Sequence, residues 1–333
     1  MRYLAKEDKL TIDLLKKVGS TTKKKLKDAG LIYLKDILMY HPSRLVELTG
    51  MSEDTANKVI EEAIEIIESE EKTTFGLLKA SKIAETLEKR KFLHTGSRKL
   101  DEILMGGYAV GEVTELAGEY RTGKSQACYT ALATAFLPPE EGGLNDGDIG
   151  VVLIDAEKTF NPKRMDKIFQ RFDLDPKYVL DRTWVGRPKS TIHQKKMIDN
   201  LVKVVKEYNV KLVIVDSLTK LPRADFAGRG ELYDRQRYIL SMVETLRRLA
   251  DTYQLVVLVT NQVVAVPDTS FVKTQIVKPI GGHVLAHTVD TRLFLSPSKE
   301  NTRWVEIWDS SWLPPAKTKI MITEAGIADP VEK

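Results

Sequence analysis

The sequence predicts an α/β fold, namely a P-loop core with a mostly parallel central sheet, preceded by a small all-α domain. Three observations predict this fold class. Strand and helix patterns alternate from about residue 75 onward, which is typical of a parallel sheet with crossover helices. Residues before about 70 lack strand patterns, and their apolar residues recur at helical spacing. The octapeptide 118–125 fits G-x-x-x-x-G-K-[ST], a loop that binds nucleotide phosphates between a strand and a helix.

The composition indicates a protein with a buried core and no bulk charge. Of the 333 residues, 42% are hydrophobic and 29% are charged, which suits one large domain and one small one. The net charge is only +4, so any nucleic-acid site must come from local patches. The single cysteine, Cys128, cannot form an internal disulfide, and we interpret it as a packing residue rather than a nucleophile. The sequence has no apolar run of about 18 residues and no signal peptide, so we expect no membrane partner.

The N-terminal region reads as helices joined by short turns. Turns at 18–20 and 49–52 each precede a predicted helix, at 23–29 and 53–68, and Ser52 can cap the second helix. A helix, a glycine turn and a helix form the layout of a helix-hairpin-helix, whose turn amides can hold a DNA phosphate. Four lysines follow the first turn: Lys23, Lys24, Lys25 and Lys27. They favour DNA binding, but a plain helical docking module with a solvated lysine face is an equal alternative.

The chain divides into three predicted parts. Residues 1–68 form the helical domain, 69–90 a linker that begins with the polar stretch 69–74, and 91–333 the core. The predicted core strands are 113–117, 150–154, 182–185, 212–215, 255–260 and 292–295, with 304–308 and 319–323 as a closing antiparallel edge. The clearest core helices are 126–136, 191–208 and 231–253.

The P-loop predicts a triphosphate site. Its residues are Gly118, Glu119, Tyr120, Arg121, Thr122, Gly123, Lys124 and Ser125. The loop amides and the following helix N-terminus present partial positive charge to phosphate. Lys124 is expected to reach the β- and γ-phosphates, and Ser125 to hold Mg²⁺. The alternative is a glycine-containing surface turn.

Carboxylates at two strand ends are candidates for the chemistry. The apolar run 212–215 is typical of a strand buried on both faces, and it ends in Asp216, which is expected to orient Mg²⁺. Glu157 follows the strand 150–154 and is the candidate for positioning the attacking water. Asp155 is the competing choice, and a surface carboxylate at a strand end is the third.

Two segments of the core are predicted to be functional loops. Gln262, after the strand 255–260, could report the γ-phosphate to a ligand-ordered loop at 263–279, which also carries Lys273. A merely flexible excursion is the alternative. Another loop is predicted at 223–235, where arginines, which suit phosphates, surround the glycines. Interleaved acids leave a solvated charge run as its alternative.

These segments together resemble the RecA-like recombinases, specifically archaeal RadA and its eukaryotic counterparts. The resemblance covers nearly the whole chain. It rests on the order of four sets of motifs: 95–107 at the entry to the core, 118–126 at the phosphate loop, 223–236 at the first loop, and 261–263 with 279–283 at the borders of the second loop.

The resemblance implies an ATP- and Mg²⁺-dependent enzyme that assembles on single-stranded DNA and exchanges strands with a homologous duplex. It implies a homo-oligomeric filament or ring, contacts with other recombination proteins, and a place in the cytoplasmic nucleoid of an archaeon. Its catalytic residues match Glu157, Lys124 and Gln262, and its nucleotide contacts add Gln126, Arg164 and Asp216, with Arg164 stacked on adenine.

Three further sets follow from the same resemblance. The cap over a neighbouring protomer's ATP matches Asp309, Ser310, Ser311, Trp312, Leu313 and Pro314. The DNA-binding residues match Arg223, Phe226, Arg229, Gly230, Arg235, Lys273, Gly281 and Gly282. The polymerisation segment matches Phe75, Leu77 and Ala80.

The sequence also departs from the family pattern. Leu77 stands where the polymerisation motif has Phe, with Phe75 two residues early, and Lys158 stands where the family has Gly. The first N-terminal turn, the stretch 296–299 and the interior of the second loop also match poorly. A divergent paralogue or mediator that assists a principal recombinase is therefore the first alternative. A RecA-fold helicase or a kinase-like circadian ATPase is the second, and the helix-hairpin-helix and Gly-Arg-Gly segments argue against it.

Overall fold

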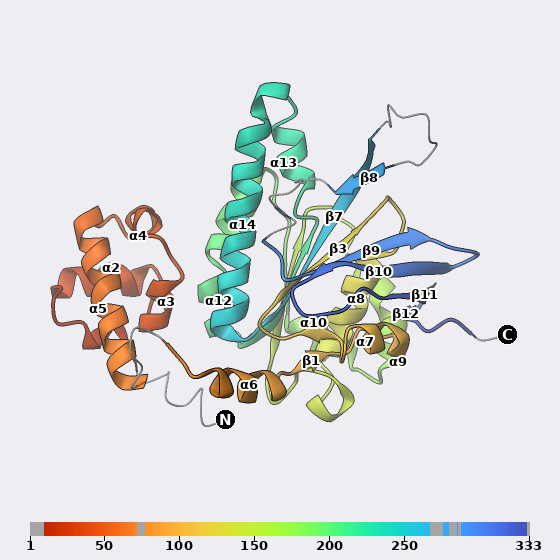
Figure 1. The fold of residues 1–333 in the computed structure, drawn as a ribbon, viewed down its shortest axis with the longest axis horizontal. Helices are drawn as coiled ribbons and strands as arrows, with labels where there is room; N and C mark the ends of the chain where they lie inside the picture. The colour runs from red at the N-terminus through yellow and green to blue at the C-terminus, as the bar shows by residue number, and fades with distance from the viewer. Residues whose placement is uncertain (1–9, 72–76, 267–275, 280–284, 286–287, 332–333) are drawn as a thin grey trace. The chain divides into compact units, whose positions relative to one another are not determined.

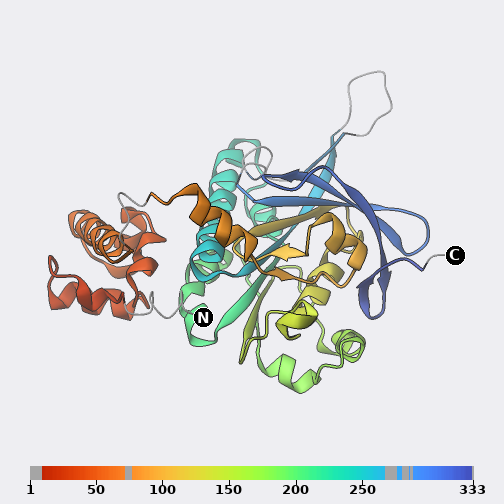
Figure 2. The ribbon, with the colours of Figure 1, turned by 60° about the horizontal axis from the view of Figure 1, so that its bottom comes forward.

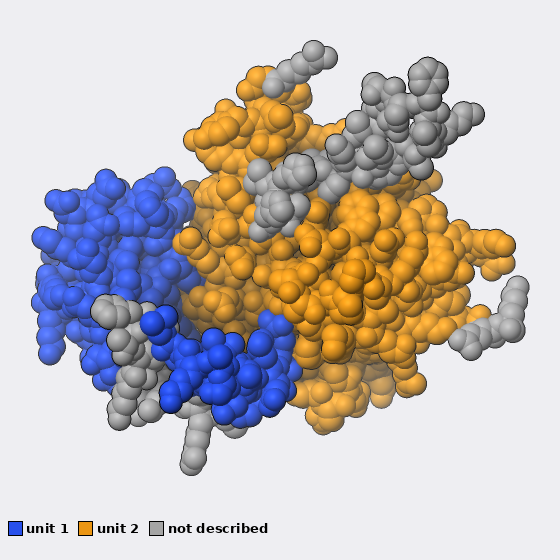
Figure 3. Space-filling model, in the orientation of Figure 1, with its two compact units in different colours: residues 1–90 blue, residues 91–333 orange. Residues whose placement is uncertain are grey.

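The computed structural model describes residues 10–71, 77–266, 276–279, 285 and 288–331. The chain divides into two compact units, residues 1–90 and 91–333, coloured separately in Figure 3.

Unit 1 is helical, as the sequence predicts. A 3₁₀ turn at Ile12–Leu14 precedes α2 Ser20–Asp28, α3 Leu34–Leu38, α4 Pro42–Thr49, α5 Glu53–Glu71 and α6 Ala80–Glu88. Both predicted turns lie before helices, and the Ser52 hydroxyl accepts from the Thr55 amide at 3.3 Å, which confirms the predicted cap of α5. Gly50 ends α4 with φ of 64°, a conformation that suits glycine. The helix α5 continues through Glu71, so the predicted end at 68 was too early.

Unit 2 is built on one large, mostly parallel sheet, which confirms the predicted fold class. The strand order is β12-β11-β10-β9-β3-β7-β6-β4-β5, and β8 pairs with β7 as a hairpin. The strands from β9 to β5 run parallel, whereas β10, β11 and β12 form the predicted antiparallel edge, drawn in blue in Figures 1 and 2. The strands are β3 Val113–Gly118, β4 Gly150–Asp155, β5 Thr183–Gly186, β6 Val210–Asp216, β7 Val256–Val266, β8 Ile276–Pro279, β9 Thr291–Pro297, β10 Thr302–Ser310, β11 Lys317–Thr323 and β12 Gly326–Ala328, with β1 Phe92–Leu93 and β2 Tyr108–Ala109 in a separate pair.

Helices cover both faces of this sheet (Figure 1). The helices α12 and α14 pack on β6 and β7, and α8 packs on the same strands from the other face, with α9 against it. Because β6 is enclosed on both sides, its residues from Leu212 to Val215 are fully buried. The helices are α7 Arg98–Ile103, α8 Lys124–Ala135, α9 Pro162–Arg171, α10 Pro176–Asp181, α11 Thr191–Asp199, α12 Leu201–Glu207, α13 Lys220–Asp225 and α14 Leu232–Tyr253.

Three predicted elements differ from the structure. The helix expected at 191–208 is broken at Asn200, whose side chain donates to the Lys196 carbonyl at 2.6 Å and so competes with the helical backbone pattern. The segment 223–235 is largely helical rather than a loop, because it holds the end of α13, a 3₁₀ turn at Arg229–Glu231 and the start of α14. Part of the loop expected at 263–279 is strand: β7 runs to Val266 and pairs antiparallel with β8.

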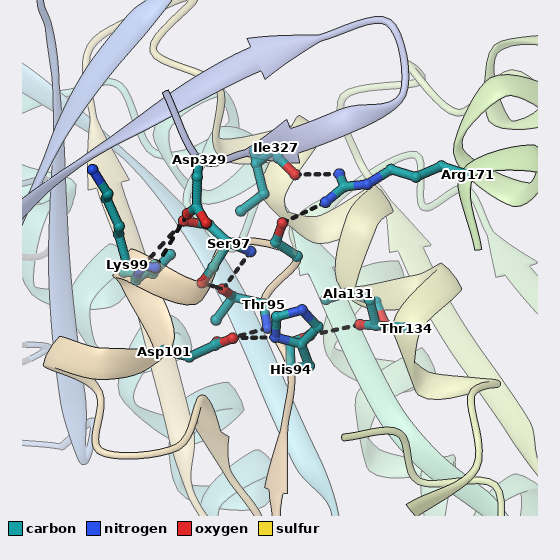
Figure 4. Close-up of polar contacts among 12 residues, drawn as sticks. His94, Thr95, Ser97, Lys99, Asp101, Ala131, Thr134, Arg171, Ile327 and Asp329 are labelled. Atoms are coloured by element: carbon teal, nitrogen blue, oxygen red, sulfur yellow. Dashed lines mark hydrogen bonds and ion pairs between the residues drawn. The ribbon is translucent and has the colours of Figure 1, made fainter. Parts of the chain in front are cut away.

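Polar contacts tie the entry to the core to the C-terminal strand (Figure 4). The Ser97 hydroxyl, at the N-cap of α7, donates to Asp329 at 2.5 Å. Arg171, the last residue of α9, donates to the carbonyls of Gly96 at 2.6 Å and Ile327 at 2.5 Å. These contacts join α7, α9 and β12 around α8, so the helix that follows the phosphate loop is held from several sides.

Candidate nucleotide-binding site

The phosphate loop lies between β3 and α8, as its sequence pattern predicts. Gly123 precedes α8 with φ of 98°, and a Cβ there would lie 2.6 Å from Cδ1 of Ile322. Only glycine leaves this space open. The Lys124 ammonium donates to the carbonyls of Gly118 at 2.9 Å and Glu119 at 2.7 Å. The lysine therefore lies over its own loop, where a bound phosphate would compete for the same N–H donors.

Asp216 lies at the end of β6 beside the phosphate loop. Its carboxylate accepts from the Ser125 hydroxyl at 2.6 Å and from the Thr260 hydroxyl at 2.5 Å. Burial raises the pKa of Asp216, and the two hydroxyl donors oppose that shift. A hydroxyl and a carboxylate side by side are the oxygen ligands that Mg²⁺ prefers, so the chemistry of this pair fits the predicted metal site.

The charge of Lys124 is also affected by the site. Burial lowers the pKa of Lys124, and the carboxylates of Asp216 and Glu157 oppose that shift. A polyanionic ligand beside this ammonium would add negative charge and so favour the charged form of Lys124.

Glu157 follows β4, and its two carboxylate oxygens have different partners. Oε1 accepts from the Ser217 hydroxyl at 2.8 Å and from the Gln262 amide at 3.4 Å. Oε2 pairs with the Lys220 ammonium at 2.9 Å. The predicted catalytic residues Glu157 and Gln262 therefore lie in contact, although β6 separates β4 from β7 in the sheet.

Asp155, the competing candidate, is fully occupied in structural contacts. It accepts from the amides of Thr159 at 3.0 Å and Phe160 at 3.2 Å, and it pairs with Arg187 at 3.3 Å. Its side chain is almost completely buried. This geometry favours Glu157 over Asp155 as the residue that faces the ligand.

One cavity of about 300 Å³ collects most of the predicted nucleotide contacts. The predicted residues that line it are Tyr120, Arg121, Thr122, Gly123, Lys124, Ser125, Gln126, Glu157, Arg164, Asp216 and Gln262. Arg164 comes from α9, at a side of the cavity that it shares with Ile322 of β11. An arginine plane and an apolar side chain together suit the faces of a base.

Six lining residues were missed in the sequence: Tyr129, Thr159, Ser217, Thr260, Arg303 and Ile322. Ser217 and Thr260 follow or end strands already chosen for their acids, so their position along the strand could have found them. Arg303 and Ile322 come from the antiparallel edge, far along the chain, and no local sequence pattern marks them.

Burial raises the pKa of the Cys128 thiol, which agrees with a packing role for that residue.

The predicted cap residues do not line this cavity. Trp312 donates its indole N–H to Glu112 at 3.2 Å, and Leu313 is buried in the core of unit 2. Their predicted role concerns a neighbouring protomer's nucleotide, so it stays a prediction.

The first predicted DNA segment is compact. Phe226 stacks on Tyr238 with ring centroids 5.2 Å apart, and Arg235 donates to the Phe226 carbonyl at 3.5 Å. Arg223 on α13 and Gly230 are exposed. The Arg229 side chain, Lys273, Gly281 and Gly282 lie outside the described residues.

The predicted polymerisation segment is open on its described side. Phe75 lies outside the described residues, whereas Leu77 is 75% exposed and Ala80 begins α6 with no buried residue on that helix. An exposed leucine of this kind is a candidate contact for another protomer.

The lysines of α2 mostly make contacts within unit 1. Lys23 donates to the Asp13 carbonyl at 2.9 Å, Lys27 pairs with the Asp13 carboxylate at 2.9 Å, and Lys25 donates to the Gly50 carbonyl at 2.7 Å. These contacts support a structural role for the lysine cluster as much as a role in DNA binding.

Across the described part of the chain, no helix has the length and apolar character needed to cross a membrane.

Comparisons with known proteins identify the family of this chain. The Rad51 family model matches residues 88–330. The chain is 38% identical to DNA repair protein RAD51 homolog B of Zea mays over 309 residues, which is 92% of this chain and 88% of the maize protein. It is 36% identical to DNA repair protein RAD51 homolog 1 of Arabidopsis thaliana over 314 residues, 94% of this chain and 89% of that protein. It is 38% identical to DNA repair protein RAD51 of Saccharomyces cerevisiae over 312 residues, 93% of this chain and 76% of the yeast protein. The chain therefore belongs to the Rad51 family.

Proposed function

We propose that this protein is a DNA-dependent ATPase and recombinase that assembles on single-stranded DNA, pairs it with a homologous duplex and exchanges strands in recombinational repair. Its relatives are named as DNA repair proteins. The observation that carries the proposal is the convergence of Lys124, Ser125, Asp216 and Glu157 on one cavity in a Rad51-family core.

Each residue has a defined part in the proposed hydrolysis. Lys124 and the loop amides bind the triphosphate, and Arg164 stacks on the adenine. Ser125 and Asp216 would hold Mg²⁺, which supplies charge stabilisation for the phosphates. Glu157 accepts a proton from the attacking water. The oxygen of that water bonds to the γ-phosphorus as the bond from the γ-phosphorus to ADP breaks. Gln262 contacts Glu157 and relays the state of the γ-phosphate to the segment after β7.

The proposal extends to assembly and DNA contacts. Residues 1–68 serve as a helix-hairpin-helix domain, 69–90 as a linker for polymerisation, and 91–333 as the ATPase core. Residues Asp309–Pro314 cap a neighbouring protomer's ATP, and head-to-tail repetition of that contact generates a filament or a ring. The exposed arginine Arg223 and its neighbours contact the DNA backbone. The same proposal includes the closer resemblance to archaeal RadA and a location in the cytoplasmic nucleoid.

A second candidate function is that of an accessory paralogue, which binds ATP and a principal recombinase without pairing DNA. Two observations favour it. Leu77 replaces an aromatic anchor in the polymerisation motif. Lys158, directly after Glu157, adopts φ of 59°, a left-handed conformation that glycine adopts more readily than lysine.

The test is strand exchange between a labelled single-strand oligonucleotide and a homologous duplex, with ATP and Mg²⁺. Homology-dependent product supports the recombinase, and a heterologous duplex serves as the control. No product from protein that still binds ATP would leave the accessory paralogue as the better proposal.

A further inference from the structure

Lys220 forms an ion pair with Glu157, the acid proposed to accept the water's proton. The ammonium lies 2.9 Å from Oε2, with the lysine side chain 41% exposed and the glutamate side chain 19% exposed. Together with the donors to Oε1 from Ser217 and Gln262, this contact leaves both oxygens of Glu157 hydrogen-bonded.

Such a set of contacts restrains the acid rather than activating it. A carboxylate must present a lone pair to the attacking water, and an ammonium at hydrogen-bond distance competes with water for that lone pair. Lys220 does not line the nucleotide cavity, whereas Glu157, Ser217 and Gln262 do. Among the described contacts, Lys220 therefore reaches the proposed hydrolysis machinery through Glu157.

The position of Lys220 in the chain links this restraint to the proposed DNA segment. It is the first residue of α13, four residues after Asp216 and three before Arg223. The ammonium stands at the end of a flexible stem, and its partial exposure leaves it open to other anions. Arg223 is exposed on the same short helix, so a DNA phosphate held there would lie within reach of the same anion-binding segment.

We infer that Lys220 is a positioning residue that restrains Glu157 in the absence of DNA and releases it when a backbone phosphate takes the ammonium. The inference rests on the proposed function, because it assumes that the α13 segment contacts DNA and that Glu157 serves hydrolysis. The ion pair between Lys220 and Glu157 is then a second link, beside the contact of Gln262 with Glu157, by which DNA accelerates ATP turnover in this chain.

The experiment compares steady-state ATP turnover of the full chain with Lys220→Gln and Lys220→Arg, with and without a single-stranded oligonucleotide. Lys220→Gln should raise kcat without DNA by about two- to five-fold, the range typical of a partly exposed ion pair. Stimulation by DNA should fall by the same factor, and KM for ATP should be unchanged. Lys220→Arg keeps the ion pair and should behave as the unaltered chain.

The matched control is Lys317→Gln, which removes another half-exposed ion pair, with Glu306 at 3.4 Å on the antiparallel edge. It should leave kcat unchanged in both conditions. An unchanged or lower kcat of Lys220→Gln without DNA would overturn the inference, whatever the DNA arm shows. A failure of the proposed function gives different results. If Glu157 does not serve hydrolysis, Glu157→Gln leaves ATP turnover intact. If DNA does not act on this ATPase, DNA fails to stimulate the unaltered chain while the effect of Lys220→Gln without DNA persists.

Discussion

A buried ion pair between two neighbouring strands gives the sharpest stability prediction. Glu115 on β3 lies directly opposite Arg292 on β9 in the parallel register, and its Oε2 accepts from the Arg292 Nε at 2.5 Å. The glutamate side chain is fully buried and the arginine side chain is 8% exposed. Oε1 accepts from the Asn261 amide at 2.6 Å. Replacing Arg292 by Met keeps the volume roughly constant and leaves the Glu115 charge without its cation.

The expected loss of stability in Arg292→Met follows from the burial of the ion pair. Breaking a buried pair by removing one partner typically costs about 3–5 kcal/mol, because the remaining charge stays in a medium that cannot solvate it. Among the described residues, Nη2 of Arg292 is buried without a hydrogen-bond partner, so the arginine already carries a desolvation cost, and we expect a loss of about 3 kcal/mol. With a urea dependence of roughly 2–3 kcal/mol per molar, the unfolding midpoint should fall by about 1–1.5 M.

The assay is urea unfolding followed by tryptophan fluorescence. All four tryptophans lie in unit 2, at positions 184, 304, 308 and 312, so the signal reports that unit alone. Lys317→Met is the control, because its half-exposed pair with Glu306 should be worth less than about 1 kcal/mol. Adding Glu115→Gln to Arg292→Met should recover more than half of the loss, since it removes the unpaired charge. An Arg292→Met variant no less stable than the Lys317→Met control would refute the reasoning.

Three further predictions follow from the site. Lys124→Ala should abolish ATP hydrolysis, because it removes the ammonium expected to bind the β- and γ-phosphates, and turnover assays check this. The fold should remain intact, because burial already disfavours that charge, and circular dichroism checks this. Lys158→Gly should raise the free energy of unfolding by up to about 1 kcal/mol, since glycine adopts φ near 59° without strain, and a thermal melt that is lowered would contradict this. Burial raises the pKa of Asp216 in the folded protein above the value of about 4 that it has in the unfolded chain. The free energy of unfolding therefore falls as the pH rises from the unfolded pKa through the folded pKa, because the folded state then has to hold a buried charge. Asp216→Asn should therefore raise the melting temperature of the ligand-free protein at pH 7, with a difference that shrinks on acidification below that folded value.

The sheet and the phosphate loop were predictable because their signals are local. A continuous apolar run identifies a strand enclosed on both faces, as in β6, and the acid at its end falls at the edge where ligands bind to a parallel sheet. The glycine at position 123 of the phosphate loop is required by the local backbone conformation, a φ of 98°, and this requirement does not depend on contacts with distant segments.

Other features depend on contacts that the sequence does not display. The break between α11 and α12 needs no proline or glycine, because Asn200 turns its side chain onto the preceding backbone. Arg303 reaches the cavity only because β10 pairs beside β9, which brings the antiparallel edge next to the phosphate loop. Apolar spacing and turn residues report neither event, since both arise when distant segments meet.

The acids at the ligand-binding edge show why residue type alone could not assign their roles. Asp155 and Glu157 are two residues apart in the sequence, and both fit a strand end followed by an acid. Asp155 is taken by two amides and an arginine, so it fixes the turn after β4. Within the described part of the chain, the carboxylate of Glu157 instead meets side chains, those of Ser217, Gln262 and Lys220, and each of these can exchange its contact for a ligand. An acid bound to backbone is committed to the fold. Glu157 is instead bound by side chains from β7, from α13 and from the residue that follows β6, so it can respond to what binds there, and this distinction makes Glu157 the better candidate for chemistry.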